Sequence, residues 1–164
     1  MPGRNVIKTY VKNGFYHIYN RGVDKRVIFL DDQDYIYFLF LLKQYLSKEL
    51  KVFNLKTKKY EVINNEKSID FKIQLLSYCL MPNHFHLLVK QLEHRSIDEF
   101  MRKLCTSYSL YFNKKYKRQG TLFQGRYKAV LIETEKQLIH VSRYIHLNPL
   151  ELVNNKITNL WCFL

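Results

Sequence analysis

The chain has 164 residues, and its 27 Lys and Arg against 14 Asp and Glu give a formal net charge of +13 at pH 7. Hydrophobic residues make up 47% and aromatic residues 15% of the chain, which suits one domain with a buried core and excludes a disordered basic tail. The positive charge indicates a polyanionic partner, with nucleic acid as the first candidate and an anionic membrane surface as the second.

The sequence shows no membrane-spanning segment, no visible secretory signal and no cysteine framework. The longest strongly apolar stretch runs only from Tyr35 to Leu42, whereas a membrane-spanning helix needs roughly 20 residues. Met1 to Thr9 carries charges and lacks the apolar centre of a secretory signal. Cys79, Cys105 and Cys162 are scattered and form no CxxC pair, so we expect free thiols in a reducing cytoplasm.

The first half of the chain predicts a strand, a helix and a polar insertion. Phe15 to Arg21 is aromatic and β-prone, which indicates a strand. From Asp31 to about Lys48, acidic residues precede an apolar surface, which is the pattern of a helix. Leu50 to Ser68 is polar, and we expect a long β-hairpin or a surface insertion there, near residues 53–68.

Three further strands are predicted in the second half. Phe71 to Leu80 and His84 to Lys90 are joined by Met81-Pro82-Asn83, a turn signal because proline fixes φ and removes a donor. Leu122 to Ile132 is the last predicted strand, and Gly125 inside it suggests a bulge or a point of close approach.

Two helices of the second half begin with capping-box patterns. Ser96-Ile97-Asp98-Glu99 precedes a helix to about Tyr116, and Thr134-Glu135-Lys136-Gln137 precedes one to about Leu147. The second helix should end there because Asn148 precedes a proline. The order of elements predicts an α+β fold, with helices packed on an antiparallel sheet, formed by residues 1–164 as one domain.

His84-Phe85-His86 is the sharpest local motif. Because side chains alternate along a strand, both imidazoles should point one way and Phe85 towards a core. Two such histidines can share a metal ion. A chain with 6 histidines can also contain this pattern by chance, so the motif alone leaves both interpretations open.

A tyrosine is the second candidate for chemistry, since a phenolate can attack a phosphodiester and form a covalent phosphotyrosine. The chain has 13 tyrosines, and most should pack in the core or stack on bases. A metal-ligating group four residues later on the same helix face is one filter. Tyr144 with Asn148 and Tyr45 with Glu49 both have it, so spacing does not select one.

Three segments carry a resemblance to a known family: Tyr16 to Phe29, Tyr78 to Val89 and Leu122 to Leu150. They resemble the single-tyrosine HUH transposases of the IS200-like type, in particular the REP-associated tyrosine transposases. The name HUH describes two histidines around a hydrophobic residue. The resemblance implies a ferredoxin-like antiparallel sheet with helices on its faces.

The resemblance also implies a site. His84 and His86 would hold a divalent metal, Mg²⁺ or Mn²⁺, with Asn148 as a third ligand. Tyr144 would attack single-stranded DNA and stay bonded to the 5′ phosphate, leaving a free 3′ hydroxyl. The substrate implied is single-stranded DNA that contains a hairpin.

Basic residues should bind that DNA. Arg21, Arg126 and Lys128 lie within the family-like segments, and we expect them to contact phosphates. Cations alternate with aromatics in residues 111–118, which favours Lys114, Lys115 and Arg118 as further contacts. The aromatics of that segment fit equally well inside a core.

Two competing functions remain at the level of sequence. One is a non-catalytic nucleic-acid-binding module on the same scaffold, which needs no metal. The other is a metal nuclease that activates water at the two histidines and forms no protein–DNA adduct. The resemblance leaves both a homodimer and a monomer open, and it implies no membrane partner.

Overall fold

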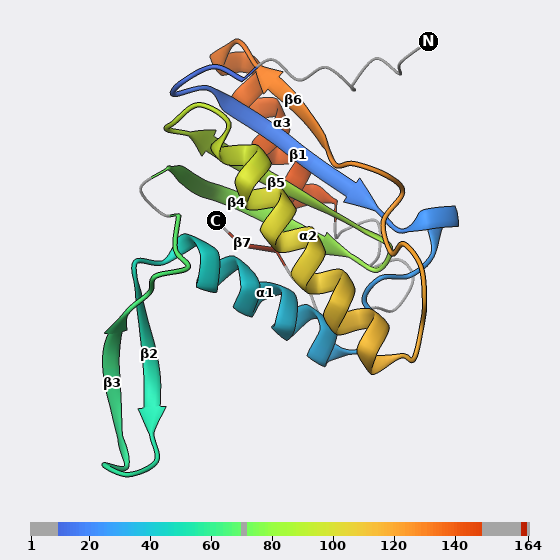
Figure 1. Cartoon of the computed structure of the whole chain (residues 1–164). Coiled ribbons are helices and arrows are strands. Elements are labelled where there is room, and N and C mark those ends of the chain that lie inside the picture. The colour runs from blue at the N-terminus through green and yellow to red at the C-terminus, as the bar shows by residue number, and fades with distance from the viewer. Residues whose placement is uncertain (1–9, 70–71, 149–161, 164) are drawn as a thin grey trace.

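The computed structural model describes residues 10–69, 72–148 and 162–163. Its centre is a five-stranded sheet with the strand order β6-β1-β5-β4-β7 (Figure 1). The strands are β1 (Phe15–Arg21), β4 (Ile73–Met81), β5 (His84–Gln91), β6 (Lys128–Ile132) and β7 (Cys162–Phe163). Neighbouring strands are antiparallel throughout. The α+β, ferredoxin-like fold class predicted from the sequence is therefore confirmed.

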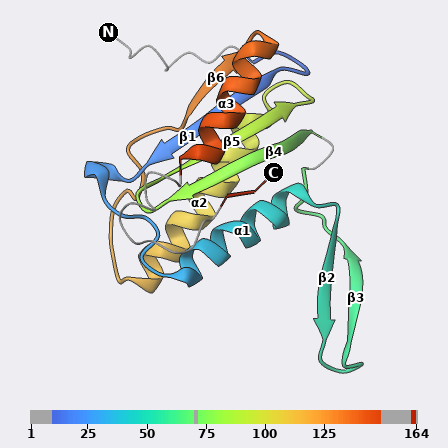
Figure 2. The same cartoon turned by 180° about the vertical axis from the view of Figure 1, so that it is seen from behind.

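Helices cover both faces of the sheet. Helices α1 (Asp32–Leu46) and α2 (Ser96–Lys115) lie on one face, and α3 (Glu135–Leu147) lies on the other (Figures 1 and 2). The larger core lies under α1 and α2, where Ile18, Phe38 and Phe85 are fully buried. In the described part of the chain, no helix is long and apolar enough to cross a membrane.

The predicted polar insertion folds as a β-hairpin that projects from the body of the protein (Figure 1). Its strands are β2 (Glu49–Asn54) and β3 (Lys59–Asn64), which form a separate two-stranded sheet. We call this hairpin the arm. Its base is closed by Asn65, whose backbone N–H donates to the carbonyl of Lys48 at 2.9 Å.

One predicted capping box is confirmed and the other is wrong. The Thr134 hydroxyl accepts from the N–H of Gln137, and the Gln137 side chain accepts from the N–H of Thr134, so α3 begins as predicted. The N-cap of α2 is instead Arg95, at φ 60°. The Ser96 hydroxyl donates to the carbonyl of Glu93 at 2.9 Å, and a hydroxyl turned that way does not cap its own helix.

The last predicted strand is shorter than expected, because β6 begins at Lys128 and not at Leu122. Before it, Phe123 forms an isolated bridge to Gly22 and the chain turns at Gly125, where φ is 70°. A Cβ at Gly125 would meet nothing within 4 Å. A glycine is therefore favoured at position 125 by the left-handed backbone conformation, and not by the close approach of another part of the chain.

Candidate active site

The two histidines of the HUH motif lie on one face of β5, as the alternation of side chains predicted. Phe85 between them points the other way and is 0% exposed in the larger core. The ring centroids of His84 and His86 are 4.9 Å apart. The strand thus presents two imidazoles side by side while its intervening residue anchors it.

Each of these imidazoles is held through its Nδ1 atom by a polar neighbour. Nδ1 of His84 lies 2.6 Å from Oδ1 of Asn83, in the turn before β5. Nδ1 of His86 lies 2.9 Å from Nε2 of His17, on the adjacent strand β1. Nε2 of His86 is buried and has no hydrogen-bond partner among the described residues.

Burial keeps two of the histidines neutral. Burial, and to a smaller extent the neighbouring His17 and His84, lowers the pKa of His86 to about 3. Burial also lowers the pKa of His17 to about 4. At neutral pH both rings are therefore uncharged, which is the form in which imidazole binds a metal ion.

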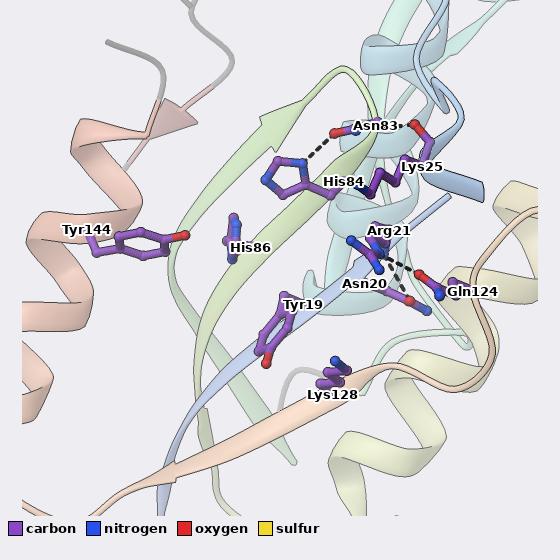
Figure 3. A pocket seen from close by; sticks show the side chains of 10 residues that line it. All are labelled: Tyr19, Asn20, Arg21, Lys25, Asn83, His84, His86, Gln124, Lys128 and Tyr144. Atoms are coloured by element: carbon purple, nitrogen blue, oxygen red, sulfur yellow. Dashed lines mark hydrogen bonds between the residues drawn. The ribbon is translucent and has the colours of Figure 1, made fainter. Parts of the chain in front are cut away.

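Tyr144 reaches the same place from α3. Its ring meets the ring of His86 edge-on, with 5.4 Å between centroids, and its centroid is 6.0 Å from that of His17. Figure 3 shows its hydroxyl directed towards His86. Because Tyr144 is 45% exposed, the hydroxyl group stays accessible to a ligand. One chain therefore supplies both the tyrosine and the histidines.

The competing tyrosine, Tyr45, has a different environment. It is 7% exposed within the larger core, and its hydroxyl shares a hydrogen bond of 2.7 Å with that of Ser107. Glu49, which the spacing paired with it, belongs to the arm. Tyr144 therefore lies beside the histidines of the HUH motif, and Tyr45 lies in the core.

His84, His86 and Tyr144 line a pocket of about 470 Å³ (Figure 3). Its lining residues are Tyr19, Asn20, Arg21, Lys25, Asn83, His84, His86, Gln124, Lys128 and Tyr144. The Nε of Arg21 donates to Oε1 of Gln124, and the Nζ of Lys128 lies 5.7 Å from the ring centre of Tyr19. With Lys25, the pocket brings three cationic side chains around the imidazoles, an arrangement suited to phosphate.

Asn148, the predicted third metal ligand, lies one helical turn after Tyr144. Its backbone N–H donates to the carbonyl of Tyr144 at 3.0 Å. It is 6% exposed, and its Nδ2 atom has no hydrogen-bond partner among the described residues. It is close in the chain to the tyrosine but does not line the pocket as described.

Arg126 lies in a different place from Arg21 and Lys128. It lines a second pocket, of about 510 Å³, which is bordered by α2. Its guanidinium is 3.7 Å from Oδ1 of Asp98, and its side chain is 76% exposed. If Arg126 binds DNA as predicted, it does so at this second pocket and not in the candidate active site.

The basic residues at the end of α2 also lie outside the first pocket as described. The Nζ of Lys115 is 2.7 Å from Asp31 and 2.8 Å from Asp34, at the start of α1. Arg118 donates to Oδ1 of Asn113 at 3.1 Å, while Lys114 is exposed. Their contacts with DNA stay predictions, and Lys115 already has two carboxylate partners.

Several residues of the site were missed from the sequence, namely His17, Tyr19, Lys25, Asn83 and Gln124. The signal for two of them was present in β1, because residues 17, 19 and 21 alternate with the buried positions 16, 18 and 20. Once Arg21 was singled out, the same face of the strand included His17 and Tyr19. Lys25 ends the short 3-10 helix η1 (Val23–Lys25) and Gln124 lies in a loop, and neither segment has such a period.

Comparisons with solved structures bear on the fold of the chain. A structure of a REP-associated tyrosine transposase bound to a REP hairpin superposes with a TM-score of 0.58 at 13% identity, over 88% of this chain and 72% of that one. A candidate transposase from Deinococcus radiodurans R1 gives a TM-score of 0.48 at 16% identity, over 85% and 93%. No curated protein matches the chain.

A family model decides the assignment. The model for IS200-like transposases matches residues 46–148, a range that contains the HUH motif on β5, the whole of α3 and Asn148. This match alone covers more than half of the sequence. The chain therefore belongs to the IS200-like transposase family.

Proposed function

We propose that this transposase cleaves and rejoins single-stranded DNA through a covalent bond between Tyr144 and a 5′ phosphate, with the help of a divalent metal. The observation that carries the proposal is the meeting of α3 and β5 at one pocket. The ring of Tyr144 lies 5.4 Å from that of His86, and His84 stands beside it.

The chemistry needs few groups. The hydroxyl oxygen of Tyr144 attacks the phosphorus, and the bond from phosphorus to the 3′ oxygen breaks. The tyrosine loses its proton and the departing 3′ oxygen gains one, so the products are a phosphotyrosine and a 3′ hydroxyl. Attack by another 3′ hydroxyl reverses the step and joins strands without a further energy source.

The residues present fit a divalent metal. Nε2 of His86 is buried without a partner, and the ring is held neutral, so its lone pair suits a cation. Bound there, Mg²⁺ or Mn²⁺ would polarise the phosphate. The described residues contain no group of three or more His, Cys, Asp or Glu side chains able to hold a metal. Oxygens from Asn148, water and DNA would complete the site.

The DNA would enter over the basic rim of the pocket. Arg21, Lys25 and Lys128 line the pocket, and we expect them to contact phosphates of the bound DNA. A protein of the same fold is bound to a REP hairpin, which supports a hairpin-containing substrate here. Tyr144, His84 and His86 line one pocket of a single chain, which supports the proposal that a monomer cleaves DNA.

The test is a denaturing gel after incubation with Mn²⁺ and a labelled single-stranded hairpin. Tyr144→Phe should abolish the covalent adduct and keep DNA binding. Tyr19→Phe is the matched control, because Tyr19 lines the same pocket, and it should still form the adduct.

Other results would favour the competing functions. An adduct that persists in Tyr144→Phe would move the nucleophile to another tyrosine. Cleavage that leaves free 5′ phosphates and no adduct would indicate a nuclease that uses activated water. Binding without any cleavage would indicate a non-catalytic module.

A further inference from the structure

His17 is a half-buried polar residue beside the site, and the proposed reaction gives it no role. It lies on β1, where it pairs with Leu88 of β5, while His86 pairs with Tyr19, so the two histidines are diagonal neighbours. Their rings stack at an interplanar angle of 27°, with 5.0 Å between centroids. Nε2 of His17 and Nδ1 of His86 are 2.9 Å apart, a normal hydrogen-bond length.

This contact restricts where the two protons lie. A neutral imidazole has one N–H and one acceptor nitrogen, so one ring donates and the other accepts. If His17 donated, His86 would carry its proton on Nε2. That N–H would be buried without an acceptor among the described residues, which is an unfavourable state. If His86 donates from Nδ1, its Nε2 keeps a lone pair that a metal can use.

We propose that His17 is a positioning residue of the metal site. It accepts the Nδ1 proton of His86, carries its own proton on Nδ1, and so keeps Nε2 of His86 unprotonated and aimed into the pocket. The metal part of this inference rests on the proposed function. The tautomer itself is a property of the metal-free protein and can be measured there.

A purely structural role for His17 makes a different prediction. Its ring also lies 5.1 Å from that of Tyr19 and 6.0 Å from that of Tyr144, so it could act only by packing. His17→Phe keeps an aromatic ring and removes the acceptor. His17→Gln removes the ring and returns an acceptor oxygen at a similar reach. His140→Phe, on the exposed part of α3, is the control.

The first measurement is a long-range ¹H–¹⁵N correlation of the histidine rings in the metal-free protein, with His86 assigned through His86→Asn. In the unmodified protein we expect a protonated Nδ1 and an unprotonated Nε2 on His86. His17→Gln and His140→Phe should preserve this pattern, and His17→Phe should lose it. A His86 protonated on Nε2 in the unmodified protein would overturn the proposal, as would an unchanged tautomer in His17→Phe.

The second measurement is a Mn²⁺ titration followed by electron paramagnetic resonance. His17→Phe should weaken Mn²⁺ binding by roughly 10–100-fold, and His17→Gln should restore most of it, as for other groups that orient metal-bound histidines. Equal affinity in His17→Phe, or a loss in His17→Gln as large as in His17→Phe, would mean that His17 only packs.

The two measurements separate the failure of this inference from that of the proposed function. If the unmodified protein binds no Mn²⁺, the metal-dependent function fails and the positioning role fails with it, whatever the tautomer. If the unmodified protein binds Mn²⁺ and forms the DNA adduct, but His17→Phe does both equally well, only the role of His17 is overturned.

Discussion

Asn148 is the ligand candidate whose role a single substitution can isolate. It is buried, and its Nδ2 atom lacks a partner among the described residues, so replacing the amide by an apolar group of similar size removes an unpaired donor. We expect Asn148→Leu to leave thermal stability nearly unchanged and to weaken Mn²⁺ binding by about tenfold or more. A thermal melt and a Mn²⁺ titration measure the two effects. Unchanged affinity would remove Asn148 from the ligand set.

At the residue scale, the sequence supports predictions that depend on local geometry. The pleat of one strand sets His84 and His86 on the same face, opposite to Phe85, and this could be predicted. The contact of His17 with His86 depends on the register between two strands far apart in the chain. That register is set by how the whole sheet packs, and no local pattern contains it.

At the scale of the elements, an ion pair between the buried Asp34 and Lys115 joins the start of α1 to the end of α2. The side chain of Asp34 is 0% exposed and is 2.8 Å from the Nζ of Lys115. Lys115→Met would leave this carboxylate without its cation, and we expect a loss of about 3 kcal/mol in the free energy of unfolding. Lys114→Met changes an exposed neighbour and should stay within about 0.5 kcal/mol. Urea unfolding of both variants tests the difference, and equal losses would contradict the buried ion pair.

The arm is an element that the rest of the fold should not need. All of β3 is exposed, and Lys48 and Asn65 meet at the base of the arm through a hydrogen bond of 2.9 Å. Replacing residues 49–64 by a two-glycine link should therefore change the free energy of unfolding by less than about 1 kcal/mol. Adduct formation on a single-stranded hairpin should persist, because no arm residue lines the pocket as described. Loss of folding would show that the arm supports the core.

The helices could be predicted well because their signals are local. The capping box of α3 fixes its first turn, and α3 ends at Leu147 as predicted. The reason given for that end is wrong, because Asn148 keeps a helical backbone at φ −49° and ψ −41° and not the extended geometry expected before a proline. The capping-box pattern at Ser96 failed because the backbone of Arg95 turns into the left-handed region and the serine bonds backwards. A four-residue motif does not contain that information, since the loop before α2 decides it.

For the whole molecule, the net charge of +13 predicts DNA binding that weakens as salt rises. Only cations that neutralise phosphates should contribute to the slope of log affinity against log salt concentration. Lys128→Met should reduce the slope of log affinity against log salt by about 0.7 on a short single strand. Lys56→Met, at the exposed tip of the arm, should leave it unchanged. Fluorescence anisotropy at several salt concentrations gives both slopes, and an unchanged slope for Lys128→Met would place the DNA elsewhere.

The three helices are attached to the sheet very unequally. In the described structure α1 buries Asp34, Tyr35, Phe38, Leu41, Leu42 and Tyr45, and α2 buries a similar set, whereas α3 buries Ile145 alone. Leu138 and Val141 of α3 also pack there but are only partly buried. Of these three helices α3 therefore buries the least apolar surface, and local opening begins where burial is least. We therefore expect the backbone amides of α3, the helix that carries Tyr144, to exchange with solvent faster than those of α1 and α2, and hydrogen exchange measures this difference.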